Sequence, residues 1–234
     1  MEKFCLLIDD EDQGPNIEKI EREGKKKNLL IKCFQYNVGG INNEHLLENG
    51  AIQLDKVMDN FHNEFQGISF DLIAFDWDFN DTVVNGIELI RVFQERKIRL
   101  KTPKLLYSGR LKDEIESYFE GYKEEKISFE TAWNRVNALV NANIVGFKDR
   151  NDYEMGIVKY FDQNQLPTPE NIIIRELRKY SSLTFHNIYP PFDNLTLSEI
   201  AQIIENDEPK GLKFLSNILE LTIAHMIDIN KSYE

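Results

Sequence analysis

The chain has 234 residues, of which 41% are hydrophobic and 11% aromatic, so most of it is expected to fold rather than stay disordered. The 28 Lys and Arg residues against 40 Asp and Glu give a formal charge of −12, which disfavours nucleic acids and anionic membranes as partners. No apolar run approaches the roughly 18 residues of a membrane-spanning helix, and no export signal is recognisable at the start. A cytoplasmic protein is therefore expected.

Short apolar runs alternate with helical patterns through the first two thirds of the chain. Each run has four to six residues, the length of a buried strand. The five predicted strands are Phe4–Ile8, Leu29–Phe34, Leu72–Phe75, Lys104–Tyr107 and Ile144–Phe147. Repeated alternation of strand and helix implies right-handed crossovers, so we expect an α/β fold with a doubly wound, five-stranded parallel sheet.

The helices predicted between these strands follow from apolar residues three and four positions apart. The longest pattern lies between the second and third strands, where apolar residues from Leu47 to Phe65 form one stripe. The predicted helices of this region cover residues 15–24, 47–65, 85–97, 111–122, 129–141 and 152–161.

A linker is predicted over residues 164–169, because Pro167 and Pro169 exclude regular pairing. The predicted domains are therefore 1–163 and a small all-α domain over 164–234, with helices at about 170–181, 197–206 and 210–230. Apolar residues recur along one face of the last helix, from Leu215 to Met226, as in a docking or dimerising helix. Acidic residues outnumber basic ones in this region, which disfavours DNA as its partner.

Polar residues gather where the predicted strands end. Ligands of open parallel sheets bind outside the carboxyl ends of the strands, so these residues are the candidates for chemistry. They are Asp9 and Asp10 after the first strand, Asp76 and Asp78 after the third, Ser108 after the fourth and Lys148 after the fifth. Neighbouring carboxylates repel each other, and oxygen ligands without His or Cys suit Mg²⁺. An aspartate beside Mg²⁺ can act as a nucleophile toward an activated phosphoryl group, with a hydroxyl and an ammonium group orienting the transferred oxygens.

Over residues 3–163 the sequence resembles the receiver domain of two-component response regulators. The strings that carry the resemblance are LLIDDED, DLIAFDWDFND, LLYSGR and the lone lysine after the last strand. The resemblance implies a flavodoxin-like sheet of order 2-1-3-4-5, which agrees with the alternation above.

The resemblance also implies roles for the residues at the strand ends. Asp9 and Asp10 correspond to the acidic pair that binds Mg²⁺, and Asp76 to the phosphate acceptor, which is also a metal ligand. Asp78 corresponds to a metal ligand through its backbone carbonyl, Ser108 to the switch hydroxyl and Lys148 to the phosphate-contacting lysine.

The implied function is that of an atypical response regulator, which modifies itself rather than turning over a substrate. The resemblance implies a histidine kinase or phosphotransfer protein as phosphodonor. The helical domain would then act on a downstream protein or a second copy of the chain.

Three features depart from the family pattern and favour an alternative. Asp149 stands where the family has a proline, Val145 replaces the switch aromatic, and Ser108 and Lys148 are 40 positions apart, about twice the usual interval. The alternative is a pseudo-receiver that acts as an adaptor without phosphorylation.

A second alternative is a haloacid-dehalogenase-type phosphatase, which Asp76-Trp77-Asp78 also resembles. The chain order argues against this class, because its acidic metal pair follows the nucleophile, whereas Asp9 and Asp10 precede Asp76.

Overall fold

The structure is a computed structural model that describes residues 2–39, 43, 46–81, 84–110, 112–113, 116, 128–164, 168–186 and 189–231. The chain forms two compact units. The first contains Met1–Glu64 and Phe70–Leu166, and the second contains Phe65–Ser69 and Pro167–Glu234. The predicted division into domains 1–163 and 164–234 stays a prediction, since residues 165–167 of the predicted linker lie outside the described residues.

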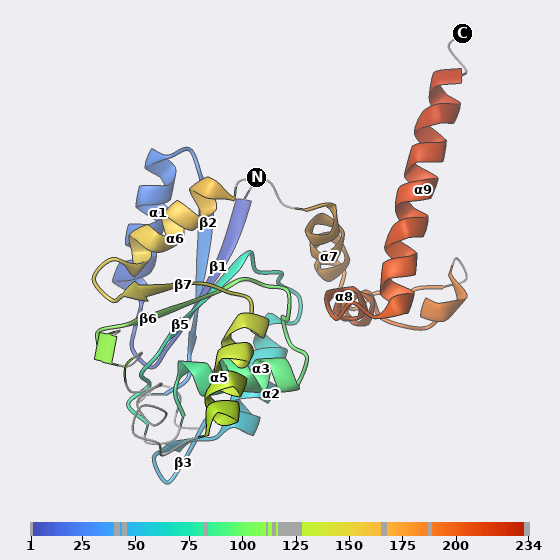
Figure 1. The fold of residues 1–234 in the computed structure, drawn as a ribbon. Coiled ribbons are helices and arrows are strands. Elements are labelled where there is room, and N and C mark those ends of the chain that lie inside the picture. Colours follow the sequence, from blue (N-terminus) through green and yellow to red (C-terminus); the bar gives the residue numbers. More distant parts are fainter. Residues whose placement is uncertain are drawn as a thin grey trace. The chain divides into compact units, whose positions relative to one another are not determined.

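A five-stranded parallel sheet forms the centre of the first unit (Figure 1). Its strands are β1 (Glu2–Asp9), β2 (Leu30–Asn37), β5 (Leu72–Asp76), β6 (Lys104–Ser108) and β7 (Ile144–Asp149). They are arranged in the order β2-β1-β5-β6-β7, which confirms the predicted order 2-1-3-4-5. Every predicted strand is present, and each runs further at its C-terminal end than its apolar run indicated. Those extensions bring Asp9, Asp76 and Ser108 into the last position of their strands.

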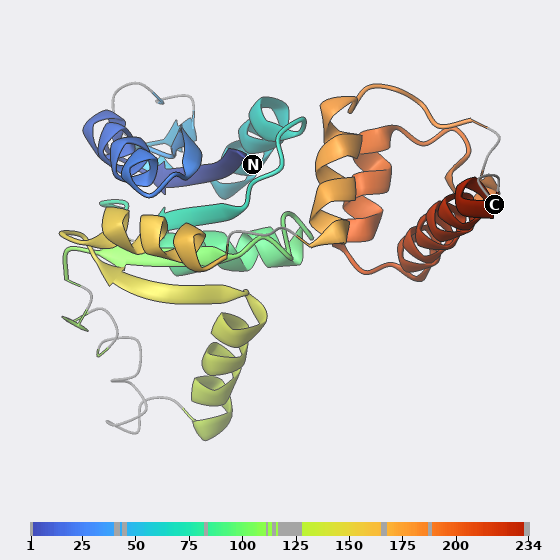
Figure 2. The same ribbon diagram turned by 90° about the horizontal axis from the view of Figure 1, so that it is seen from above.

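Helices cover both faces of this sheet, as Figures 1 and 2 show. On one face, α1 (Gly14–Lys26) and α6 (Tyr153–Gln163) pack against a buried cluster of strand residues that includes Leu7, Ala74 and Leu105. On the other face lie α2 (Leu54–Phe65) and α3 (Gly86–Glu95). There Phe93 of α3 contacts both Phe61 of α2 and Phe75 of β5, edge to face. The doubly wound α/β class is therefore confirmed.

Two helices were predicted between the fourth and fifth strands of the first unit. The helix predicted over 129–141 is present as α5 (Phe129–Asn141). The helix predicted over 111–122 lies largely outside the described residues.

The predicted helix over 47–65 is wrong for its first residues. Instead, β3 (Leu47–Glu48) and β4 (Ala51–Ile52) form a small antiparallel hairpin, and α2 begins only at Leu54. The turn residues Asn49 and Gly50 have φ angles of 52° and 79°. An Asn-Gly pair readily adopts two successive positive φ angles, which tight hairpins require and a helix forbids. This local turn preference outweighs the helical spacing of the apolar residues.

The second unit is helical, as predicted. It contains α7 (Pro169–Lys179), a short 3₁₀ helix η2 (Pro190–Phe192), α8 (Leu197–Glu205) and α9 (Pro209–Lys231). Its core includes Ile174, Phe192, Ile200 and Phe214. Thr196 caps α8 in a capping box with Glu199. None of the helices that the structure describes is both long and apolar enough to span a bilayer.

A buried ion pair joins two helices of the second unit, and breaking it should be costly. Arg178 Nη2 donates to Glu205 Oε2 at 2.8 Å, and the two side chains are only 6% and 5% exposed. Arg178→Met removes one half of a buried, hydrogen-bonded ion pair, so we expect a loss of about 3–5 kcal/mol in the free energy of unfolding. Urea unfolding followed by circular dichroism measures this loss.

The neighbouring Lys179 provides the control for that variant. Its pair with Glu176 is at the surface, with both side chains more than half exposed, so Lys179→Met should cost less than about 1 kcal/mol. Equal losses in the two variants would contradict a structural role for the buried pair.

Candidate functional site

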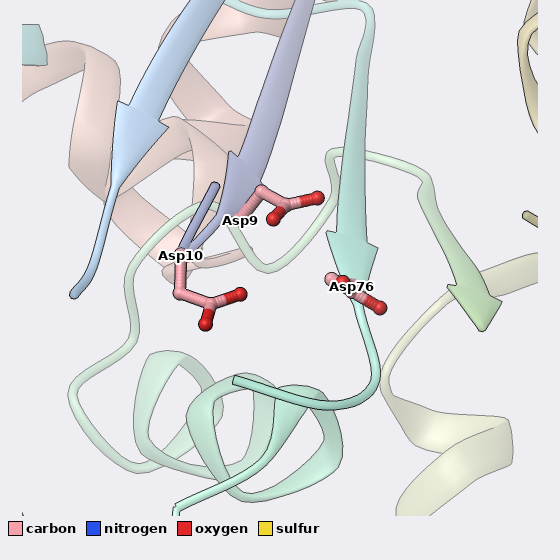
Figure 3. A group of neighbouring side chains, drawn as sticks. All are labelled: Asp9, Asp10 and Asp76. Atoms are coloured by element: carbon pink, nitrogen blue, oxygen red, sulfur yellow. The ribbon is translucent and has the colours of Figure 1, made fainter. Parts of the chain in front are cut away.

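Three carboxylates meet at the C-terminal edge of the sheet. Asp9 ends β1, Asp10 follows it, and Asp76 ends the adjacent strand β5 (Figure 3). One oxygen from each side chain lies within 4.8 Å of the others. Asp9 and Asp76 are fully buried, whereas Asp10 is half-buried. Parallel pairing of β1 with β5 places the ends of both strands side by side, which is why residues 67 positions apart share one site.

Asp9 is held by several donors. Its Oδ1 accepts a hydrogen bond from the backbone N–H of Glu11 at 2.8 Å. Its Oδ2 accepts from the Tyr107 hydroxyl and from Gln13 Nε2, each at 2.7 Å. Gln13 is itself fixed by the Tyr153 hydroxyl, which donates to its Oε1 at 2.7 Å. The rings of Tyr107 and Tyr153 stack with centroids 4.1 Å apart, so β6 and α6 hold Asp9 in one orientation.

Burial changes the acidity of both buried aspartates. It raises the pKa of Asp9 above its ordinary value. It raises the pKa of Asp76 to about 7, with the neighbouring charge of Asp9 as the second cause, while Arg150 acts in the opposite direction. Asp76 is therefore protonated in part of the molecules near neutral pH. A cation bound between the carboxylates would favour the ionised, nucleophilic form.

The residues present fit a small hard cation. Oδ1 of Asp10 is buried and has no hydrogen-bond partner within the part of the chain that the structure describes. Its other oxygen accepts from Asn80 Nδ2 at 2.8 Å. A buried carboxylate oxygen without a donor, close to two further carboxylates, is an arrangement that cation binding would satisfy. The ligand set consists of oxygen atoms alone, which suits Mg²⁺ better than zinc.

Asp78 lies beside this cluster and is oriented by its own contacts. Its carboxylate accepts from Arg110 Nη2 at 2.9 Å and from the backbone N–H of Asn80 at 3.0 Å. A backbone bridge between Asp78 and Asn85 fixes the loop that leads into α3. Its predicted role as a carbonyl ligand stays a prediction.

Ser108 occupies the end of β6 and is 2% exposed. Its hydroxyl oxygen accepts a hydrogen bond from the backbone N–H of Arg110 at 3.0 Å. Its carbonyl oxygen accepts from the backbone N–H of Arg150 at 2.9 Å. Ser108 therefore fixes the backbone that follows β6 and, through its carbonyl, the backbone that follows β7.

Lys148 lies in β7, but its side chain runs along α6. A Cβ atom at Gly156 would come within 2.9 Å of Lys148 Cε, so the lysine stem uses the space that this glycine leaves. The ammonium group forms no ion pair or hydrogen bond with any residue that the structure describes. Tyr107 of β6 pairs with Asp76 on one side and with Lys148 on the other. Paired residues of parallel strands point to the same face, so Lys148 and Asp76 lie on one face of the sheet, with the strand that carries Tyr107 between them.

Arg150 is the cation that contacts the carboxylates, and the sequence analysis missed it. Its Nη1 lies 2.6 Å from Asp76 Oδ2, and its Nη2 lies 2.7 Å from Glu11 Oε2 and 3.4 Å from Asp9 Oδ2. A turn after β7, closed by a hydrogen bond from Asp152 N–H to Asp149 O, directs Arg150 back over the strand ends. The available signal was a second cation two residues after Lys148. Sequence spacing alone gave no reason to prefer it.

Comparison with known proteins gave matches among solved structures. No family model matches the chain, and no curated protein matches its sequence. A Francisella response regulator 1452 receiver domain is 14% identical, with coverage of 70% of this chain and 99% of that chain and a TM-score of 0.35. A response regulator from Burkholderia multivorans is 13% identical, with coverage of 72% and 98% and a TM-score of 0.37.

A two-component response regulator from Legionella pneumophila is 15% identical, with coverage of 69% of this chain and 98% of that chain and a TM-score of 0.37. Each of these matches spans nearly all of the matched chain and leaves about 30% of this chain uncovered. These three solved structures, to which this chain is similar over about 70% of its length, are thus response regulators, one of them a receiver domain.

Proposed function

We propose that this chain is a receiver of a phosphorelay, which accepts a phosphoryl group on Asp76. The observation that carries the proposal is the buried Asp76 carboxylate at the end of β5, which shares one site with Asp9 and Asp10. The strand order places these three residues where ligands of open α/β sheets bind.

In the proposed step, an oxygen of the Asp76 carboxylate attacks the phosphorus of an activated phosphodonor. The bond between that phosphorus and the donor's leaving group breaks, and the leaving group departs with the electron pair. The product is an acyl phosphate on Asp76, and no proton is consumed when Asp76 begins ionised. Asp9, Asp10 and Asp76 would hold Mg²⁺ with the Asp78 carbonyl, and the ion would neutralise charge on the transferred oxygens.

Ser108 is the proposed hydroxyl for a phosphoryl oxygen, because it ends the strand next to β5. The family resemblance implies that Lys148 is the cation that contacts the phosphoryl group. The contacts around Asp76 favour a different cation, Arg150.

The proposed partners are a histidine kinase or phosphotransfer protein as donor and a downstream protein for the helical region, within the cytoplasm. Leu219, Ile223 and Met226 of α9 are about half exposed or more. These apolar side chains at spacings of four and three suit a partner helix, including one from a second copy of the chain.

Phosphoryl acceptance is tested by incubating the full chain with acetyl phosphate and Mg²⁺ and measuring its intact mass. We expect the wild type to gain the mass of one phosphoryl group and Asp76→Asn to gain none. Asp12→Asn is the matched control, because Asp12 lies on the loop after β1 but is exposed. Acceptance by the Asp76→Asn variant would contradict the proposal.

A second candidate function is a pseudo-receiver adaptor. The observation that favours it is the Arg150 guanidinium, which already neutralises the carboxylates at the strand ends. No mass gain from acetyl phosphate, carbamoyl phosphate or phosphoramidate in a folded wild type would favour the adaptor. Release of phosphate from unrelated monoesters would instead favour the phosphatase class.

A further inference from the structure

We infer that Arg150 is the cation that contacts the phosphoryl group on Asp76, and that the same guanidinium competes with Mg²⁺ for the carboxylates before phosphorylation. The inference rests on the proposed phosphoryl acceptance by Asp76. It assigns the cationic role to a residue other than the lysine that the family resemblance indicates.

The guanidinium is already placed at the acceptor. Nη1 donates to Asp76 Oδ2 at 2.6 Å, while Nη2 donates to Glu11 at 2.7 Å. The Arg150 side chain is 32% exposed, whereas those of Asp76 and Asp9 are 1% and 0% exposed. Arg150 therefore approaches the acidic cluster from the solvent side, from which a phosphodonor must also come.

Two features of the fold hold Arg150 in this position. The backbone N–H of Arg150 donates to Ser108 O, which continues the β6–β7 pairing by one residue. The next residues form a turn in which Asp149 Oδ1 accepts from the backbone N–H of Asn151 at 2.9 Å. The backbone at Arg150 is therefore fixed on both sides, and only its side chain needs to move when the charge at Asp76 changes.

The chemistry of the acyl phosphate favours this contact. Attack by Asp76 adds a phosphoryl group with further anionic oxygens at the position of the carboxylate. A guanidinium presents several N–H donors in one plane, which match two phosphate oxygens at once, and it stays charged at all physiological pH values. Glu11 is more than half exposed, so Arg150 can exchange that carboxylate for phosphoryl oxygens without leaving a buried charge unpaired.

The same contacts imply competition with the metal ion. Arg150 donates to Oδ2 of Asp76 and approaches Oδ2 of Asp9 at 3.4 Å, and both residues belong to the group that could hold an ion. Removing the guanidinium takes a positive charge away from the carboxylates. It also leaves Oδ2 of Asp76 without the hydrogen bond from Arg150. Arg150→Ala should therefore bind Mg²⁺ more tightly and yet accept a phosphoryl group more slowly. A purely structural arginine would not produce effects of opposite sign.

Both effects are measurable on the full chain. Trp77 follows Asp76 and is 4% exposed, so its fluorescence is a suitable reporter of Mg²⁺ binding without any phosphodonor. We expect Arg150→Ala to lower the Kd for Mg²⁺ about tenfold, the change that about 1.4 kcal/mol produces. We expect its phosphorylation by acetyl phosphate, followed by intact mass, to be about 100-fold slower.

Two further variants test whether the positive charge at position 150 is needed and whether a cation at position 148 can supply it. Arg150→Lys keeps the positive charge and should recover part of the phosphorylation rate. Lys148→Ala removes the cation that the family resemblance indicates, and it should slow phosphorylation less than Arg150→Ala does. Weaker Mg²⁺ binding in Arg150→Ala would overturn the competition. Loss of phosphorylation in Lys148→Ala with a normal rate in Arg150→Ala would overturn the assignment to Arg150. If the wild type itself accepts no phosphoryl group, the proposed function fails together with the phosphoryl contact.

Discussion

Asp76→Asn should be more stable than the wild type at pH 8, although it lacks the proposed phosphate acceptor. The pKa of Asp76 lies at about 7, against an ordinary value of 3.8, because the carboxyl group is buried and lies beside Asp9. Ionisation of Asp76 therefore destabilises the folded state, by an amount of the order of 4 kcal/mol at about 1.4 kcal/mol per pH unit. Asparagine keeps the size of the side chain and cannot ionise. Urea unfolding in the presence of a chelator measures the difference.

The pH dependence follows from the direction of the pKa change. Because the folded pKa is raised above the unfolded value, the folded wild type binds more protons than the unfolded chain between about pH 4 and pH 7. The stability contributed by protonated Asp76 is present at low pH and is lost as the pH rises through about 7. The advantage of Asp76→Asn should therefore be largest at pH 8 and should shrink steadily as the pH falls toward 4.

The other contacts of Arg150 limit the loss of stability that Asp76→Asn causes by removing one of its partners. After Asp76→Asn it retains the carboxylate of Glu11 at 2.7 Å and that of Asp9 at 3.4 Å, so the guanidinium is not left unpaired. Asp78→Asn is the control, because the Asp78 carboxylate is 41% exposed and its loss should change stability by less than about 1 kcal/mol. Lower stability of Asp76→Asn than of the wild type at pH 8 would contradict the expectation.

Gly86→Ala should strongly destabilise the first unit. Gly86 is the first residue of α3, and a Cβ atom there would lie 2.1 Å from the carbonyl oxygen of Asp76. The backbone N–H of Gly86 also donates to Trp77 O at 2.9 Å, so the two backbones are held together. Neither can move without displacing α3 from the end of β5. We expect a loss of about 3 kcal/mol or more in the free energy of unfolding.

Gly146→Ala is the matched control for this close approach. A Cβ atom at Gly146, in β7, would meet no atom within 4 Å, so the substitution should change stability by about 0.5 kcal/mol or less. Urea midpoints of the two variants and the wild type test the prediction. If Gly86→Ala unfolds at the same urea concentration as Gly146→Ala, α3 does not approach β5 as closely as the structure has it.

The apolar runs determined most of the first unit. Five buried strands separated by helices leave few ways to form a parallel sheet, because right-handed crossovers restrict the strand order. The order 2-1-3-4-5, which the family resemblance implied, places Asp9 and Asp76 on adjacent strands and at the same edge. The hairpin at residues 47–52 was missed because apolar spacing was given more weight than the Asn49-Gly50 pair, whose positive φ angles end the helical pattern.

The sequence by itself therefore determined the sheet, its acidic edge and the helical character of the C-terminal region. Only the tertiary structure decided which cation contacts the acidic edge. Lys148 and Arg150 are two residues apart, and the choice between them depends on the packing of the Lys148 stem at Gly156 and on the turn after β7. The pKa of Asp76 was likewise decided by burial and by the charge of Asp9. Both properties arise from groups far apart in the chain, because electrostatic interactions depend on distances in space, which sequence spacing does not contain.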